Sequence, residues 1–171
     1  VKLFVLDDFP APVPEGDFER IYNELGVDTE TFYRKIWWPF IRRLAEEEDI
    51  RYTGAIIETY GAQVKGPFRP LGGRAARDGL IIYGRELLNM GGELGLHGYN
   101  HQPLAPAGYG QPRLNYVPWE SQADMEEALR ELRNYIKSVY PDYEFRFYVP
   151  PSNIMSPEGK EAIRKVFPEV I

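Results

Sequence analysis

The sequence predicts an α/β fold made of parallel β/α units, and three observations support this. Short apolar runs of strand length alternate with segments of helical periodicity along the chain. Polar side chains come directly after the apolar runs, as they do at the carboxyl ends of parallel strands. The chain has 171 residues, of which 43% are hydrophobic, and this is enough for one domain with a substantial core.

The predicted strands are four apolar runs, each of which ends at acidic residues, histidines or prolines. They cover residues 1–6, 52–58, 93–96 and 144–149. We expect the first to be a buried strand that ends before Asp7 and Asp8, and the third to lead directly into His97. Residues 169–171 have the composition of the start of a fifth strand.

The predicted helices lie between the strands and repeat apolar side chains every three or four residues. They cover residues 29–49, a stretch within 74–90, residues 120–140 and a last helix that starts at Pro157. Thr29 is the expected N-cap of the first helix, and Pro39 is expected to kink it. Gly91 and Gly92 are expected to close the second helix, and Ser156 to cap the last.

Two architectures fit this order of strands and helices. A doubly wound sheet and a (β/α) barrel both join parallel strands through helical crossovers. Four and a half units are too few to close a barrel, so a barrel would be incomplete in this chain. Because the chain starts at Val1 and stops within the last apolar run, we expect residues 1–171 to be part of a longer protein.

Composition excludes several classes of function. The net charge is −6, from 20 basic and 26 acidic residues, which disfavours a partner made of nucleic acid. The chain has no cysteine, so disulfides, thiolate metal sites and a cysteine nucleophile are excluded. No apolar run is long enough to span a membrane, and no secretion signal is visible.

The polar residues after the strands are the candidates for a functional site. They are Asp7 and Asp8, Glu58 and Tyr60, His97 and His101, and the turn 150–153. Parallel strands would bring two carboxylates and two imidazoles to one face, and such groups are ligands of catalytic Zn²⁺ sites. The spacing of four between the only two histidines suits one ion in a tight turn. Two polar loop residues without a metal remain the alternative.

Two segments resemble motifs of the polysaccharide deacetylase family, the carbohydrate esterases of family 4 with a NodB homology domain. "LFVLDDFPAP" is similar to the first motif and "GELGLHGYNHQPL" to the second, and residues 149–153 fall where the family has its third. The three stretches come in the family's order and follow the predicted strands. The resemblance implies a distorted (β/α) barrel, with residues 1–171 as the N-terminal part of the domain.

The resemblance also implies roles for individual residues. Asp8, His97 and His101 would bind a divalent metal ion, with Zn²⁺ expected. Asp7 would be the general base that takes a proton from the attacking water, and a backbone N–H at Ser152 would stabilise the oxyanion. The implied reaction removes acetyl groups from an N- or O-acetylated polysaccharide or oligosaccharide, at the cell envelope or outside the cell.

Three departures from the family pattern leave other functions open. Val149 stands where the family has an arginine that orients the base, and Gly98 replaces a residue with a hydroxyl group. The family's general-acid histidine has no counterpart, because no third histidine exists in the chain. The alternatives are a non-catalytic carbohydrate-binding module on a degenerate deacetylase fold, or a metal-dependent amide hydrolase of another substrate.

Aromatic residues make up 14% of the chain, and three of them lie in the loop after the histidines. Tyr109, Tyr116 and Trp119 are candidates to stack on sugar rings, and the alternative is that they pin this long loop. Trp38 and its neighbour Trp37 are expected in the core. Glu58 fits either an acid that supports the metal ligands or a surface residue.

Overall fold

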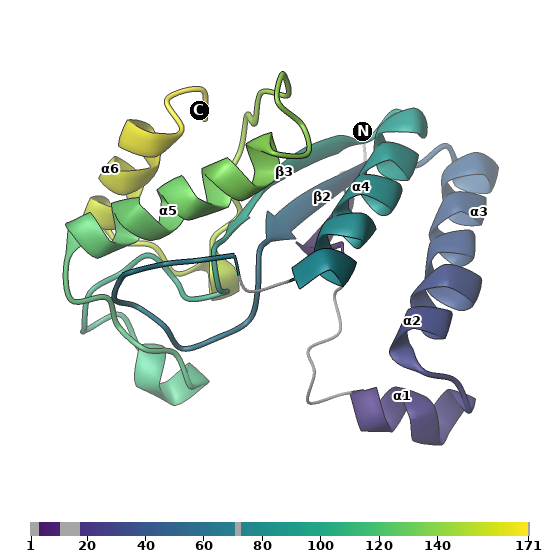
Figure 1. Ribbon diagram of the computed structural model, residues 1–171, viewed down its shortest axis with the longest axis horizontal. Helices are drawn as coiled ribbons and strands as arrows, with labels where there is room; N and C mark the ends of the chain where they lie inside the picture. Colours follow the sequence, from purple (N-terminus) through teal and green to yellow (C-terminus); the bar gives the residue numbers. More distant parts are fainter. Residues whose placement is uncertain (1–3, 11–17, 71–72, 171) are drawn as a thin grey trace.

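A computed structural model describes residues 4–10, 18–70 and 73–170, which form a three-stranded parallel sheet with helices packed around it (Figure 1). The strands are β1 (Phe4–Phe9), β2 (Tyr52–Ile57) and β3 (Glu93–Gly98), in the order β1-β2-β3. The helices are α1 (Phe18–Leu25), α2 (Thr29–Phe32), α3 (Trp38–Glu48), α4 (Gly73–Asn89), α5 (Gln122–Lys137) and α6 (Pro157–Val166). The predicted α/β fold of parallel β/α units is confirmed.

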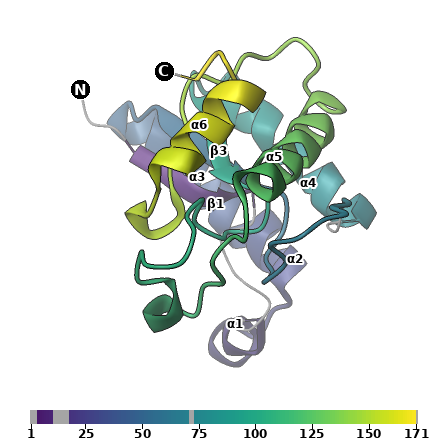
Figure 2. The ribbon, with the colours of Figure 1, turned by 90° about the vertical axis from the view of Figure 1, so that its left-hand side faces the viewer.

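The core lies between the sheet and the surrounding helices. Every residue of β2 is buried, because this strand pairs with β1 on one side and β3 on the other. Leu80 and Leu87 of α4 and Leu132 of α5 are fully buried in the same core. Helices α5 and α6 lie side by side in both views (Figure 1, Figure 2). None of the helices in the described ranges is long and apolar enough to cross a lipid bilayer.

The first strand differs from the prediction in its position and burial. Residues 1–3 lie outside the described residues, and β1 continues through Asp7 and Asp8 to Phe9 instead of ending before them. Val5 is 38% exposed, because β1 pairs only with β2 among the described strands. The pairing shifts between Leu6 and Phe9, where Asp8 has a φ of 55°. This irregularity sets the direction of the Asp8 side chain.

The predicted helix at 29–49 is one continuous path with a wide turn in the middle. Asp28, not Thr29, is the N-cap, because its Oδ1 accepts a hydrogen bond of 2.7 Å from the N–H of Thr31. The π-helical turn η2 (Tyr33–Trp37) precedes Pro39. Proline has no N–H and its ring crowds the preceding turn, so the helix widens there instead of kinking.

The two tryptophans of this path pack inward, as expected. Trp38 is 2% exposed and stacks on Tyr83 of α4 with the ring centroids 4.8 Å apart. Trp37 is partly buried against the same core. Helix α1 was not predicted, although Phe18, Tyr22 and Leu25 repeat at helical spacing. None of its residues is buried, so this apolar spacing was its only sequence signal.

The prediction of a fourth strand at 144–149 is wrong for the described structure. This segment makes a single parallel bridge, between Leu96 of β3 and Tyr148. The N–H of Leu96 donates to the carbonyl oxygen of Phe147, and the N–H of Val149 donates to that of Leu96. Gly95 has no side chain, and this admits the ring of Phe147 against β3. The segment is therefore anchored to β3 without forming a regular strand.

The remaining boundaries agree with the sequence to within a few residues. Helix α4 ends in a turn where Gly91 has a φ of 76°, and Ser121 caps α5. Ser156 caps α6, with Pro157 at its first position. The expected fifth strand is absent from the described residues, since 168–169 form a turn, and Ile171 lies outside them.

Replacing Gly159 with alanine is expected to lower the free energy of unfolding by about 2–3 kcal/mol. A β-carbon at Gly159 would overlap the carbonyl oxygen of Leu104, so α6 would have to move away from the loop that follows β3. In Gly79→Ala, on α4, the added carbon would meet only ordinary contacts at 3.8 Å or more. That variant should be neutral or more stable, because alanine favours helices. Urea unfolding measures both, and equal effects would contradict the close approach of α6.

Candidate metal centre

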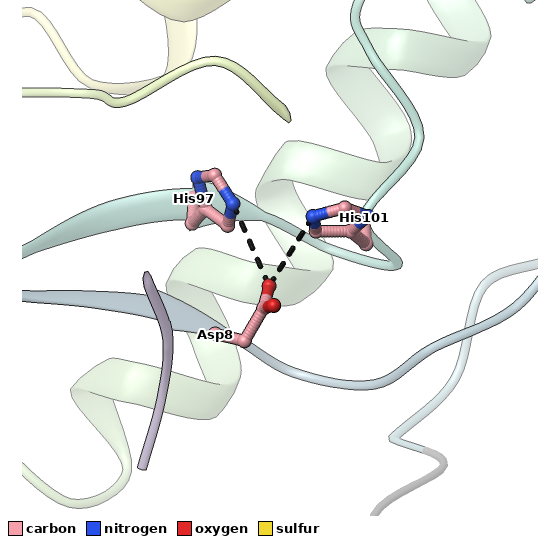
Figure 3. A group of neighbouring side chains, drawn as sticks. All are labelled: Asp8, His97 and His101. Atoms are coloured by element: carbon pink, nitrogen blue, oxygen red, sulfur yellow. Dashed lines mark ion pairs between the residues drawn. The ribbon is translucent and has the colours of Figure 1, made fainter. Parts of the chain in front are cut away.

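Three side chains from two strands and the following turn converge on one point. The Nε2 atom of His97 lies 3.5 Å from Oδ1 of Asp8, and that of His101 lies 3.3 Å from the same oxygen (Figure 3). One ligand atom from each of the three residues lies within 4.8 Å of the others. Asp8 and both histidines are thus brought together as the sequence predicted.

Local backbone geometry turns these side chains toward each other. Asp8 and His101 have φ values of 55° and 60°, which residues other than glycine rarely adopt. Gly98, at the end of β3, has a φ of 115°, where glycine has no steric penalty. The chain turns sharply after β3, and the two imidazole ring centroids come within 5.0 Å.

The hydrogen bonds of His97 determine which of its nitrogens faces Asp8. Its Nδ1 lies 2.6 Å from the carbonyl oxygen of Val149, and a carbonyl can only accept, so Nδ1 carries the proton and donates. A neutral His97 therefore presents the Nε2 lone pair to Asp8. The contact with a backbone carbonyl is the arrangement by which proteins orient metal-binding histidines.

The donor set fits a divalent cation. Oδ1 of Asp8 is buried, and no hydrogen-bond donor reaches it from the described part of the chain. A lone pair of His97 and a carboxylate oxygen thus face each other without a proton to join them. A positive ion between Asp8, His97 and His101 would satisfy all three, and two imidazoles with one carboxylate is a known ligand set for zinc.

Burial affects the titration of the groups around this point. It lowers the pKa of His101, opposed by the negative charge of Asp8, and the lowered pKa favours the neutral imidazole that a metal requires. Tyr60 follows β2, and its ring centroid lies 5.7 Å from that of His101. Burial and then the charge of Asp8 raise the pKa of the Tyr60 hydroxyl, so it stays protonated.

Two amide side chains next to His101 hold the turn in place. The side-chain amide of Gln102 donates to the carbonyl oxygen of Gly61 at 2.7 Å, and its Oε1 accepts from the N–H of Val117 at 2.8 Å. Asn100 donates to the carbonyl oxygen of Gln63. These bonds tie the loops after β2 and β3 together on both sides of His101. Their partners are backbone groups, so the sequence did not reveal the network.

The other predicted site residues lie around the three ligands in different environments. Asp7 is exposed on β1, and its charge acts on His101. Tyr116 lies beside His101, with its hydroxyl 2.8 Å from Oγ of Ser152. Tyr109 is 41% exposed on the long loop after β3. These residues surround the metal ligands or lie on the loop that follows them.

The expectation that Trp119 stacks on a sugar is corrected by the structure. Trp119 is 2% exposed and packs against Phe68, with the ring centroids 5.9 Å apart. Its backbone N–H donates a hydrogen bond of 3.1 Å to the carbonyl oxygen of Ala105, in the same loop. The alternative interpretation, that this tryptophan pins the loop, describes what is observed. A tryptophan in a loop gives the same sequence signal whether its ring is buried or exposed.

Two further residues lie near the site, and the sequence had singled out only the first of them. Glu58, after β2, is 4% exposed, so the surface interpretation is wrong. The Tyr148 hydroxyl is buried and would lie 3.1 Å from a β-carbon at Gly98, where the deacetylase motif has a residue with a hydroxyl group. A hydroxyl is therefore present beside this turn, although it comes from the segment bridged to β3.

Comparison with solved structures shows a fold of the deacetylase type. A chitin deacetylase from the fungus Colletotrichum lindemuthianum matches with a TM-score of 0.53 and 13% identity, over 99% of this chain and 53% of that one. The Xyl-CE4 domain of a multidomain xylanase from the hindgut metagenome of Trinervitermes trinervoides matches with 0.51 and 15%, over 95% and 54%. A CE4 family pseudoenzyme from Bacillus anthracis matches with 0.52 and 13%, over 78% and 36%.

These similarities establish the fold alone, because the identities are low. The chain spans 36 to 54% of the length of the three proteins, so its strands and helices correspond to part of a (β/α) barrel. No curated protein matches the sequence. One family model matches residues 1–171 in full. The chain belongs to this family, which is described as "Uncharacterised protein conserved in bacteria (DUF2194)".

Proposed function

We propose that this chain carries the metal site of a hydrolase that removes acetyl groups from N- or O-acetylated polysaccharide. The observation that carries the proposal is the convergence of Asp8 Oδ1 and the two Nε2 atoms on one point. The proton on Nδ1 of His97 is already committed to Val149, so its Nε2 can serve as a ligand.

Asp8, His97 and His101 would hold the ion, and Zn²⁺ is the proposed one. Such an ion supplies Lewis acidity to an acyl carbonyl and to water at neutral pH. Val149 fixes the orientation of His97 through its carbonyl oxygen, and the polar network around His101 keeps that ring in place. The ligands are thus held before an ion arrives, which reduces the cost of ordering them.

Asp7 is proposed as the general base. It is adjacent in sequence to the ligand Asp8 and exposed, so a water and a substrate can reach its carboxylate. The carboxylate would take a proton from the attacking water, and the backbone N–H of Ser152 would donate to the oxygen that becomes negative. Ser152 has a φ of 49° in η4 (Pro151–Asn153), a strained turn of the kind found at functional sites.

An acetylated polysaccharide is the substrate class that the surroundings favour. Tyr109 offers an exposed aromatic ring on the loop after β3, and such rings stack on sugars. Two proteins with this fold are a chitin deacetylase and a domain of a xylanase. We place the protein at the cell envelope or outside the cell, and residues 1–171 as the N-terminal part of a longer barrel.

Acetate release tests the proposal. The full-length protein, stripped with a chelator and reloaded with Zn²⁺, should release acetate from acetylated chito-oligosaccharides or xylo-oligosaccharides. The stripped protein should be inactive and should recover when the ion returns. Release from a small acetamide but from neither oligosaccharide would favour an amide hydrolase of another substrate. Activity that persists without any divalent ion would exclude a metal-dependent reaction.

A carbohydrate-binding module without catalysis is the second candidate. Val149 favours this candidate, because the deacetylase motif has an arginine at this position. Only the carbonyl oxygen of Val149 takes part in the site. One protein with a similar fold is described as a pseudoenzyme. In this case the Zn²⁺-loaded protein would bind an acetylated oligosaccharide in calorimetry and release no acetate.

A further inference from the structure

We infer that His101, Tyr116 and Ser152 form a directional hydrogen-bond chain that leaves the Ser152 hydroxyl as a donor to an acceptor oxygen of the ligand. The inference rests on the proposed metal-binding role of His101. It assigns Tyr116 a positioning role in place of stacking on a sugar ring. It also assigns Ser152 a side-chain role, in addition to the backbone N–H proposed above.

The three side chains are connected by two contacts. The Tyr116 hydroxyl oxygen lies 3.3 Å from Nδ1 of His101 and 2.8 Å from Oγ of Ser152. The residues come from the turn after β3, the long loop that follows it and the turn η4. Tyr116 therefore joins three segments that are separate in sequence.

The direction of the chain follows from counting protons. Nε2 of His101 faces Asp8 Oδ1, the point proposed for the ion, so the lone pair must be on Nε2 and the proton on Nδ1. Nδ1 then donates to the Tyr116 oxygen. The hydroxyl of Tyr116 has one proton, which is directed to Oγ of Ser152. The Ser152 proton has no role within the chain and is available to an external acceptor.

The backbone holds each member of the chain in place. The N–H of Tyr116 donates to the carbonyl oxygen of Gln111 at 2.9 Å, and the N–H of Val117 donates to Gln102 at 2.8 Å. Ser152 is exposed and sits in a left-handed conformation after the buried Pro151. Its hydroxyl is thus fixed on one side by Tyr116 and open to solvent on the other.

The consequence is a preference for a ligand with an acceptor oxygen near the metal ligands. The carbonyl of an acetyl group meets this requirement, as does a carboxylate, whereas a group that can only donate does not. Occupation of the metal site and the donor character of Ser152 are linked, because an ion at Nε2 of His101 sets the proton arrangement.

Histidine NMR tests the first part of the chain, and the two histidines make the spectrum simple. In Zn²⁺-loaded protein labelled with ¹⁵N-histidine, both rings should carry the proton on Nδ1. Tyr116→Phe should speed the exchange of the His101 Nδ1 proton about tenfold or more and leave that of His97 unchanged. Tyr109→Phe, in the same loop, is the matched control and should change neither. Coordination of Zn²⁺ through Nδ1 of His101, or unchanged exchange in Tyr116→Phe, would overturn the inference.

Binding of acetate, used as an acceptor-only probe at saturating Zn²⁺, tests the second part. Ser152→Ala and Tyr116→Phe should each weaken acetate binding roughly tenfold, the loss expected for one hydrogen bond to a charged group. The double variant should lose no more than either single one, since both break the same chain. Additive losses, or unchanged binding in Ser152→Ala, would contradict the directional chain.

The two proposals fail in different ways. Zn²⁺ binding with the expected proton positions, together with no acetate release from any oligosaccharide, would remove the hydrolase and leave the hydrogen-bond chain. Acetate release with proton exchange unaffected by Tyr116→Phe would leave the hydrolase and remove the chain. A full-length protein that binds no divalent ion would remove both.

Discussion

Replacing His97 with alanine is expected to weaken Zn²⁺ binding by a factor of roughly 1,000 or more, because it removes one of three protein ligands. His97 is the most buried of the three, with 3% of its side chain exposed. No other histidine lies beside Asp8 and His101 to replace it. Competition with a chromogenic chelator measures the affinity.

Asp8→Asn provides the second variant, because it keeps the shape of the side chain. It should lose Zn²⁺ affinity to a similar extent, since it removes the only negative charge from the three ligands. Without the ion it should be more stable than the parent by about 1 kcal/mol, because an amide can donate to the Nε2 lone pair of His97, which now faces a buried carboxylate oxygen. Asp142→Asn, at an exposed position, is the matched control. Parental Zn²⁺ affinity in both His97→Ala and Asp8→Asn would contradict the proposed centre.

Asp7→Asn is expected to lower the rate of acetate release by roughly 1,000-fold, the size of a general-base contribution. Its Zn²⁺ affinity should change by less than about threefold, because Asp7 is not among the converging ligands. A variant that loses acetate release but keeps its Zn²⁺ affinity identifies Asp7 as a base, since damage to the whole site would lower both quantities. Measurement of acetate release at saturating Zn²⁺ makes the comparison.

Asp142→Asn serves as the control for Asp7→Asn. Asp142→Asn removes an exposed carboxylate far along the chain and should leave the rate unchanged. Asp7→Asn protein that releases acetate at the parental rate would show that another group takes the proton. Loss of Zn²⁺ binding in Asp7→Asn would instead move this residue into the metal site.

Much of the fold follows from local patterns in the sequence. The buried run of β2 and the periodic apolar face of α5 are visible without coordinates, because strand and helix periodicities depend on neighbouring residues. Ser156 as a cap and Gly91 at a helix end follow from backbone hydrogen bonding and from φ > 0. The extent of β1 and the widened turn before Pro39 depend on strand pairing and on tertiary packing. The sequence therefore predicted a strand that ended too early and a kink in place of the wide turn.

For the site, the sequence by itself determined which groups are available: two imidazoles, adjacent carboxylates and a turn rich in proline, placed after successive β segments. The tertiary structure decided which atoms meet. The carbonyl oxygen of Val149 selects the proton position of His97, 52 residues away in the chain, and Trp119 is buried while Tyr116 is bonded to His101. Backbone carbonyls are the same at every residue, so a contact of this kind has no signature in a sequence and exists only after the segments have packed.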